Sequence, residues 1–347
     1  MDNGSFVRGA QQLLESWLER PRIRSMRGAR EGRTDLIVEQ GPLRKAVELK
    51  GAGDSAAVGA AIAAAKAAAS RLGRNVLPVV VVPYMGAVGK KLCADAGVSW
   101  FDLSGNAHIV APGLRILIDG KPNQFVRRGR PGTAFAPKSS RIARRLLIDP
   151  QKPWRQQDLA HAAGLDDGFT SRIIQRLEHD RLVERTPNGS VRVRDANLLL
   201  DAWSEVYDFE KHAIVRGHVS ARDGEELVAR TSDALEEKIR YAATGLAAAY
   251  LYTEFAAFRL ATFFVERRPP EPLLKALGFR EENRGANVWL VIPNDIGVFD
   301  GADETSKVAH CVHPVQAYVD LKAHPERAEE AAAELRSRLL QWTPNAA

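Results

Sequence analysis

The stretch between Arg33 and Lys50 constrains the fold most strongly, because it combines a predicted hairpin with a set of charged side chains. Two short runs rich in branched apolar residues flank Gly41-Pro42, a typical turn pair. Side chains alternate along a strand, so Glu48 and Lys50 are expected on one face, which Asp35 can reach from the partner strand. Two carboxylates and a lysine placed in this way can hold a divalent metal and activate water for phosphodiester cleavage.

An acid followed by Glu-x-Lys resembles the core of the PD-(D/E)xK nucleases. The resemblance implies catalytic roles for Asp35, Glu48 and Lys50, with Mg2+ held by Asp35 and Glu48 if the site is active. It also implies a further carboxylate from the first helix, for which Glu15 is the best candidate. The alternative is purely structural, since Glu-x-Lys pairs are common on exposed strand faces.

The elements expected before residue 120 follow an α/β layered order, in which helices and strands alternate around a sheet. Apolar residues recur at helical spacing from Phe6 to Leu18, and an alanine-rich helix is expected over 55–72. The remaining expected elements are a strand over Val76–Pro83, a helix over Gly86–Ala96 and a strand over Val98–Phe101. Residues 1–120 are therefore predicted to form a restriction-endonuclease-like α/β domain.

Length and cysteine content bound the class of protein. A chain of 347 residues is expected to form several domains. Cys93 and Cys311 lie far apart, which argues against a disulfide framework and suits a reducing compartment. Without a signal peptide or a membrane-spanning apolar run, the sequence predicts a cytoplasmic protein.

Positive charge is concentrated in the middle of the chain. Residues 121–194 hold sixteen Lys and Arg against seven Asp and Glu, whereas the whole chain has a net charge of only +6. A local excess of this kind is typical of proteins that bind polyanions. Within it, residues 121–137 are predicted to be a basic linker, whose Arg127, Arg128 and Arg130 could add non-specific DNA contacts.

Residues 138–195 have the pattern of a winged helix-turn-helix. Three amphipathic helices are expected, the third starting after the turn Gly164–Gly168. A hairpin then forms around Asn188-Gly189, a strong hairpin signal. In this motif the third helix enters the major groove of duplex DNA.

The expected DNA contacts divide into two groups. Outward residues of the third helix are expected to reach base edges or phosphates, namely Thr170, Ser171, Arg172, Gln175 and Arg176. Wing arginines are expected to contact phosphates, namely Arg185, Arg192 and Arg194. The alternative is a winged helix used for protein contacts or dimerisation, but the arginine content favours DNA.

Residues 196–347 predict a C-terminal α/β domain with no obvious catalytic constellation. Two buried helices are expected over Ser232–Phe264, a strand over Asn287–Pro293 and a terminal helix over Pro325–Trp342. Four scattered acids, which are usually surface residues, could bind metal, namely Asp295, Asp300, Asp303 and Asp320. A second metal hypothesis is a site formed by His310, Cys311 and His313.

Several short motifs occur in a specific order along nearly the whole chain. They include Phe-Asp-Leu-Ser-Gly-Asn106, Lys-Ser-Ser-Arg-Ile-Ala-Arg-Arg145, Asn-Leu-Leu-Leu-Asp-Ala-Trp203 and His-Pro-Val-Gln-Ala-Tyr-Val-Asp-Leu321. This series resembles the AbiEi-like antitoxins of type IV toxin–antitoxin (abortive infection) systems, in the long form with a restriction-endonuclease-like N-terminal domain. Simple members of that family carry the winged helix at the N-terminus, whereas here it is central.

The resemblance implies a bacterial transcriptional regulator that binds duplex DNA, with a nucleotidyltransferase-like toxin as its partner. A homodimer is compatible with that role. The competing hypothesis is an active Mg2+-dependent DNA endonuclease that the winged helix targets to DNA. A third is an interaction protein whose C-terminal domain sequesters a toxin.

Overall fold

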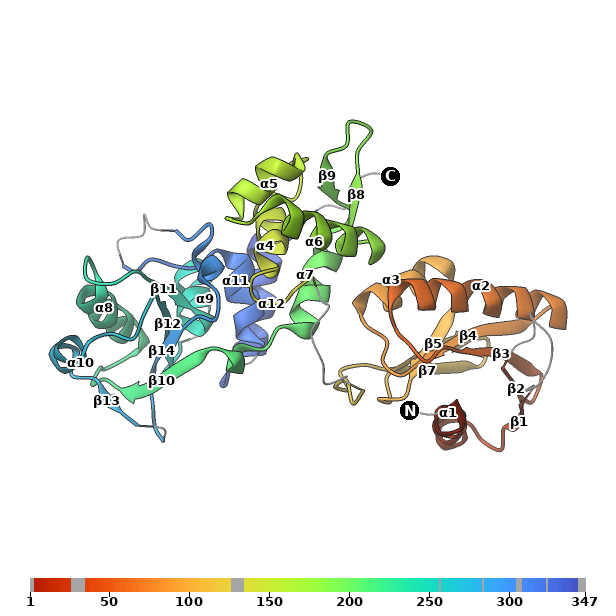
Figure 1. Ribbon diagram of the computed structural model, residues 1–347. Helices are drawn as coiled ribbons and strands as arrows, with labels where there is room; N and C mark the ends of the chain where they lie inside the picture. Colours follow the sequence, from red (N-terminus) through yellow and green to blue (C-terminus); the bar gives the residue numbers. More distant parts are fainter. Residues whose placement is uncertain are drawn as a thin grey trace. The chain divides into compact units, whose positions relative to one another are not determined.

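The computed structural model describes residues 3–25, 35–125, 134–255, 257–282, 284–303, 308–322 and 324–342. The chain divides into two compact units (Figure 1). The first unit consists of Met1–Arg130 and His179–Arg181, and the second of Pro131–Glu178 and Leu182–Ala347. Arg127, Arg128 and Arg130 of the expected linker lie outside the described residues.

A seven-stranded sheet forms the centre of the first unit, and its strands lie in chain order. The neighbours β3, β4 and β5 are parallel, and the other pairs are antiparallel. The strands are β1 (Arg22–Ser25), β2 (Leu36–Gln40), β3 (Leu43–Leu49), β4 (Val76–Val82), β5 (Ser99–Asp102), β6 (Ala107–Ala111) and β7 (Leu114–Ile118). The predicted hairpin is confirmed as β2–β3, with Gly41 in the turn at a φ of 55°.

Helices cover both faces of this sheet. α1 (Asn3–Trp17) lies on one face, and α2 (Ser55–Leu72) and α3 (Ala87–Ala96) lie on the other (Figure 1). Val47 and Leu49 of β3 belong to the core under α1, whereas Ala46 packs with α2. Because side chains alternate along a strand, Glu48 lies on the α2 face.

The second unit begins with three helices and a two-stranded hairpin, as the sequence predicts for residues 138–195. These elements are α4 (Ser140–Ile148), α5 (Gln156–Ala162), α6 (Asp167–His179), β8 (Val183–Arg185) and β9 (Val191–Val193). Gly189 adopts a φ of 81° in the hairpin turn, a conformation that favours glycine. A fold of this shape can present α6 and the hairpin to a ligand.

The rest of the second unit is built on a five-stranded mixed sheet with the order β11-β12-β14-β10-β13. Its strands are β10 (Ala213–His218), β11 (Tyr241–Thr244), β12 (Ala261–Val265), β13 (Arg280–Glu281) and β14 (Val288–Ile292). Two helices pack together on one face, α8 (Gly224–Leu235) and α10 (Glu271–Leu277), and three on the other, α9 (Gly245–Thr253), α11 (Pro314–Leu321) and α12 (Ala328–Leu339) (Figure 1). α7 (Ala196–Val206) and the short helix η2 (Ile296–Phe299) complete the unit.

The prediction of two buried helices over Ser232–Phe264 is wrong in part. α9 is a helix, but the flanking segments form β11 and β12. Every residue of β12 is buried, so the strand lacks the polar alternation that separates strands from helices in a sequence. No helix among the described residues has the length and apolar character needed to cross a membrane.

Candidate functional site

The turn between α5 and α6 sets where α6 starts. Gly164 adopts a φ of 61° directly after the end of α5. Asp166 then caps α6, because its Oδ1 accepts a hydrogen bond of 2.7 Å from the amide of Phe169. Glycine and an acidic cap at these positions turn the chain sharply and start a new helix.

α6 presents a polar, cationic face. Arg172, Gln175 and Arg176 are exposed, and Ser171 is half-buried beside them. The Arg172 guanidinium lies 5.8 Å from the centre of the Phe169 ring, and Lys138 Nζ lies 5.5 Å from the same ring. The aromatic ring thus gathers two cations near the first turn of the helix.

Thr170 does not belong to this face, and the prediction that it points outward is wrong. Its side chain is fully buried. Thr170 precedes Ile173, Ile174 and Leu177 by three, four and seven positions, so it shares their buried stripe. The same spacing in the sequence was sufficient to exclude it.

The wing arginines are held by acidic neighbours. Arg185 Nε lies 3.1 Å from Glu178, and its guanidinium also donates to the carbonyl of Gly189 at 3.2 Å. Arg192 pairs with Glu184, and Arg194 lies 3.8 Å from the same carboxylate. These carboxylates compete with any phosphate for the arginines. Each wing arginine would therefore attract a phosphate less strongly than an unpaired arginine would.

Three arginines of α4 turn toward the C-terminal part of the second unit, and with their partners they form what we call the arginine seam. Nε and Nη2 of Arg141 donate to the carboxylate of Asp295 at 2.7 and 2.8 Å. Arg144 is buried and donates twice to Gln316 Oε1 at 3.0 and 2.7 Å, and Arg145 donates to Asp300 at 3.1 Å. These arginines add to the positive charge of residues 121–194, but their side chains bind other parts of the same unit.

Beyond Gln316 the seam continues into a buried polar network around Asp320. Its carboxylate accepts hydrogen bonds from the hydroxyls of Tyr207 and Thr244 and from Gln316 Nε2 at 2.8 Å. His212 accepts from the amide of Asn294 through Nδ1 at 3.0 Å, so its neutral ring can donate from Nε2 to the Tyr207 oxygen 2.9 Å away. Full burial raises the pKa of Asp320 to about 7.

The expectation that the four C-terminal acids are surface residues is therefore wrong for two of them. Asp320 is fully buried, and the side chain of Asp295 is only 11% exposed in its ion pair. The motif His313–Leu321 contained a usable signal, because Gln316 and Asp320 are four residues apart and lie on one face of an otherwise apolar helix. Buried polar groups at such a spacing require partners.

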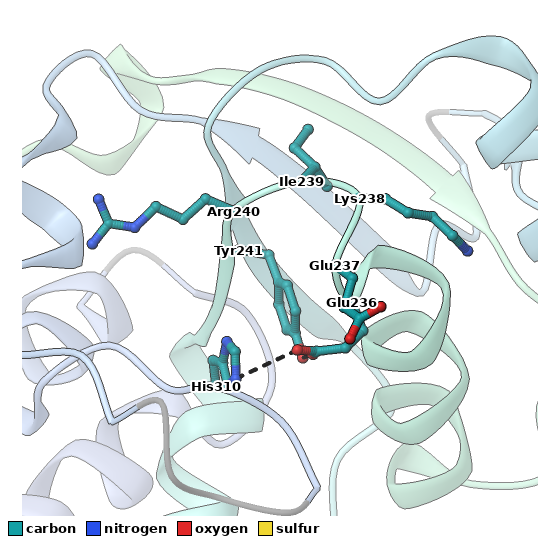
Figure 2. A pocket seen from close by; sticks show the side chains of 7 residues that line it. All are labelled: Glu236, Glu237, Lys238, Ile239, Arg240, Tyr241 and His310. Atoms are coloured by element: carbon teal, nitrogen blue, oxygen red, sulfur yellow. Dashed lines mark hydrogen bonds and ion pairs between the residues drawn. The ribbon is translucent and has the colours of Figure 1, made fainter.

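A pocket of about 590 Å3 opens beside β11 (Figure 2). Glu236 accepts a hydrogen bond from the Tyr241 hydroxyl at 2.7 Å and lies 3.7 Å from His310 Nε2. The Tyr241 and His310 rings are stacked, with centres 5.1 Å apart. Burial raises the pKa of the Cys311 thiol to about 12, which disfavours the thiolate that would bind a metal. The described residues also contain no group of three metal-ligating side chains, so the metal hypothesis for this segment gains no support.

In the first unit, the structure brings three of the four predicted catalytic residues together. Lys50 Nζ lies 3.0 Å from Glu48 Oε1, and Asp35 accepts a hydrogen bond of 2.8 Å from the amide of Leu49. The pKa of Glu48 is raised by its burial and by the charge of Asp35, against the lowering effect of Lys50. Glu15 is exposed on α1, which packs on the face of the sheet opposite to Glu48. It is not among the groups that shift the pKa of Glu48.

The chain was compared with models of protein families. The family described as transcriptional regulator, AbiEi antitoxin, type IV toxin–antitoxin system matches residues 192–341. This segment runs from β9 to the residues after α12 and includes neither α6 nor the first unit. Comparisons of the chain with curated proteins and with solved structures give no match. The C-terminal part of this chain is thus similar to the AbiEi antitoxin regulators of type IV toxin–antitoxin systems.

Proposed function

We propose that the protein is a DNA-binding transcriptional regulator of the antitoxin type, which contacts duplex DNA through α6. The observation that carries this proposal is the exposed face of α6, where Arg172 and Arg176 are one helical turn apart with Gln175 beside them. Arginine and glutamine side chains can pair with base edges in the major groove through two hydrogen bonds. The similarity of residues 192–341 to antitoxin regulators supports the same role.

The wing and the C-terminal part have distinct roles in this proposal. Arg192 and Arg194 exchange Glu184 for backbone phosphates when DNA binds, which adds affinity without sequence preference. A nucleotidyltransferase-like toxin is the proposed partner of the C-terminal part, in line with the family that this part resembles.

The double substitution Arg172→Ala/Arg176→Ala should weaken DNA binding by roughly thirtyfold or more, since each of the two base contacts contributes at least about 1 kcal/mol. Sequence preference should relax at the same time. Fluorescence anisotropy measures this on a labelled duplex selected from a random-sequence pool by the wild-type chain, and on a scrambled duplex, over a salt series.

A charge-matched control separates contact from net charge. The double variant Lys275→Ala/Arg284→Ala removes two exposed cations from the same unit, away from α6, and should change affinity little. Equal affinities and salt slopes for the α6 variant and the wild type would mean that α6 does not touch DNA, and the proposal would then lose its main support.

A second candidate function, metal-dependent DNA cleavage, is favoured by one observation: the cluster of Asp35, Glu48 and Lys50. Two carboxylates fit the donor set of Mg2+, which usually completes its shell with waters and substrate phosphates. Asp35 and Glu48 would hold the ion, which lowers the pKa of bound water. Lys50, now paired with Glu48, would orient the attacking water.

If this site is active, Asp35→Asn and Lys50→Ala should each abolish cleavage while the domain stays folded. Asparagine keeps an oxygen for the amide of Leu49, so the substitution removes the charge and retains the hydrogen bond. Nicking of supercoiled plasmid with Mg2+ or Mn2+ measures the activity, and Glu39→Gln on the same hairpin serves as the control. If supercoiled plasmid, linear duplex and single-stranded DNA all stay intact with either metal, the nuclease hypothesis is contradicted.

A further inference from the structure

One side chain connects the C-terminal part of the second unit to the turn of the helix-turn-helix. Arg141 donates through Nε and Nη2 to Asp295, which lies at the start of η2. Its third nitrogen, Nη1, donates to the carbonyl of Ala163 at 3.4 Å. The guanidinium thus contacts two segments that lie 132 positions apart along the chain, at Ala163 and at Asp295.

The contacted carbonyl lies where the orientation of α6 is set. Ala163 is the C-cap residue directly after α5, and Gly164 follows it in a left-handed conformation. A Cβ added to Gly164 would lie 3.4 Å from Arg141 Nη1, so the turn and the guanidinium are in close contact. Two residues later Asp166 caps α6, and any displacement of the turn is therefore transmitted to the first turn of that helix.

We propose that Asp295 is a positioning residue for DNA binding, which acts through Arg141 on the α5–α6 turn. The inference rests on the proposed function, because it assigns a second role to residues outside the DNA-contacting face. The side chains of Arg141 and Asp295 are 15% and 11% exposed, so the pair is largely shielded from water and from salt. An arginine fork held at two points has a defined orientation, which an exposed ion pair lacks.

A purely electrostatic effect and a positioning role predict opposite changes in DNA affinity when the carboxylate of Asp295 is removed. Removal of an acidic group raises the net charge, and on charge alone the variant should bind the DNA polyanion more tightly. If Asp295 positions α6, the same change should weaken binding. A large decrease in affinity after the removal of a negative charge would have no simple electrostatic explanation.

The test is Asp295→Asn, measured by fluorescence anisotropy on the selected and scrambled duplexes. Asparagine at position 295 retains an oxygen that can accept from the amide of Gly297, so the cap of η2 is kept. It loses the second oxygen, which accepts from Nη2 of Arg141. We expect about a tenfold loss of affinity for the selected duplex, a value typical of coupled sites, with little change on the scrambled duplex or in the salt slope. Asp295→Glu should restore part of the affinity.

A double-mutant cycle and a matched control complete the experiment. In an Arg141→Ala background, Asp295→Asn should have no further effect, because the route through Arg141 is already broken. Asp201→Asn breaks an aspartate–arginine pair with Arg336, between α7 and α12, and should leave affinity unchanged. Thermal unfolding of each variant confirms that it is folded at the assay temperature.

The outcomes separate this inference from the proposed function. Wild-type protein that binds no duplex would overturn both. Wild-type binding that depends on Arg172 and Arg176, with equal or tighter binding by Asp295→Asn, would overturn the positioning role alone. Additive effects of Arg141→Ala and Asp295→Asn would also overturn it, since the two residues would then act independently.

Discussion

Replacement of Arg144 by alanine is expected to lower the free energy of unfolding of the second unit by about 3–5 kcal/mol, because it removes two buried, charge-assisted hydrogen bonds to Gln316 and leaves a cavity. Gln316 Oε1 would lose both of its donors from the guanidinium. The cation–π contact with Trp203, at 5.1 Å, would be lost as well. Gln316 would then be free to rotate, and its hydrogen bonds to Asp320 and Tyr207 would weaken with it.

Urea denaturation of the full chain, followed by tryptophan fluorescence and circular dichroism, measures this loss. Arg144→Met fills more of the space and should cost less than Arg144→Ala, and the difference between them reports the cavity. The exposed substitution Lys275→Ala should stay within about 0.5 kcal/mol of the wild type. A loss below about 1 kcal/mol for Arg144→Ala would show that the seam contributes little to the stability of the unit.

Acidification from pH 7 to pH 4 is expected to destabilise the second unit strongly, because three histidines are buried in their neutral form. Burial and the charge of Arg144 lower the pKa values of His212 and His313 to about 4, and burial lowers that of His324 to about 4. Their folded-state pKa values lie below the ordinary value of 6.5, so the stabilisation is present above pH 6.5 and is lost as the pH falls through 4.

Protonation would also break specific hydrogen bonds. His212 and His313 each accept a backbone amide through Nδ1, from Asn294 and Val315, and a protonated ring cannot accept. His212 and His324 are at most 8% exposed, and each should account for about 3 kcal/mol over this range. The raised pKa values of Asp320 and Asp300 act in the opposite direction, but two carboxyl groups offset three histidines only in part.

The measurement is the free energy of unfolding at intervals between pH 7 and pH 4. His212→Asn keeps an acceptor for the amide of Asn294 but does not titrate in this range, so it should flatten the pH dependence by about one proton. The exposed His161→Asn is the matched control. Constant stability over the whole range would contradict the proposed tautomers and the burial that enforces them.

The sequence by itself determined the local structure of this protein. Gly41-Pro42 and Asn188-Gly189 specify tight turns between apolar runs, and both hairpins form where they were predicted. Helical periodicity located α1 and α4 to α6, and alanine content located α2, for the same reason, since both signals depend on neighbours in the chain. The alternation along β3 likewise placed Glu48 and Lys50 together.

Only the tertiary structure decided how the polar side chains are used. Arg141, Arg144 and Arg145 have the same sequence character as Arg172 and Arg176, yet the former meet partners more than 150 positions away. The fully buried β12 could not be distinguished from a helix, because both of its faces are covered by segments distant in the chain. Asp320 and the buried histidines acquire their shifted pKa values only when folding removes water from around them. Hydration, burial and long-range pairing depend on which segments come together, and a local pattern does not encode that.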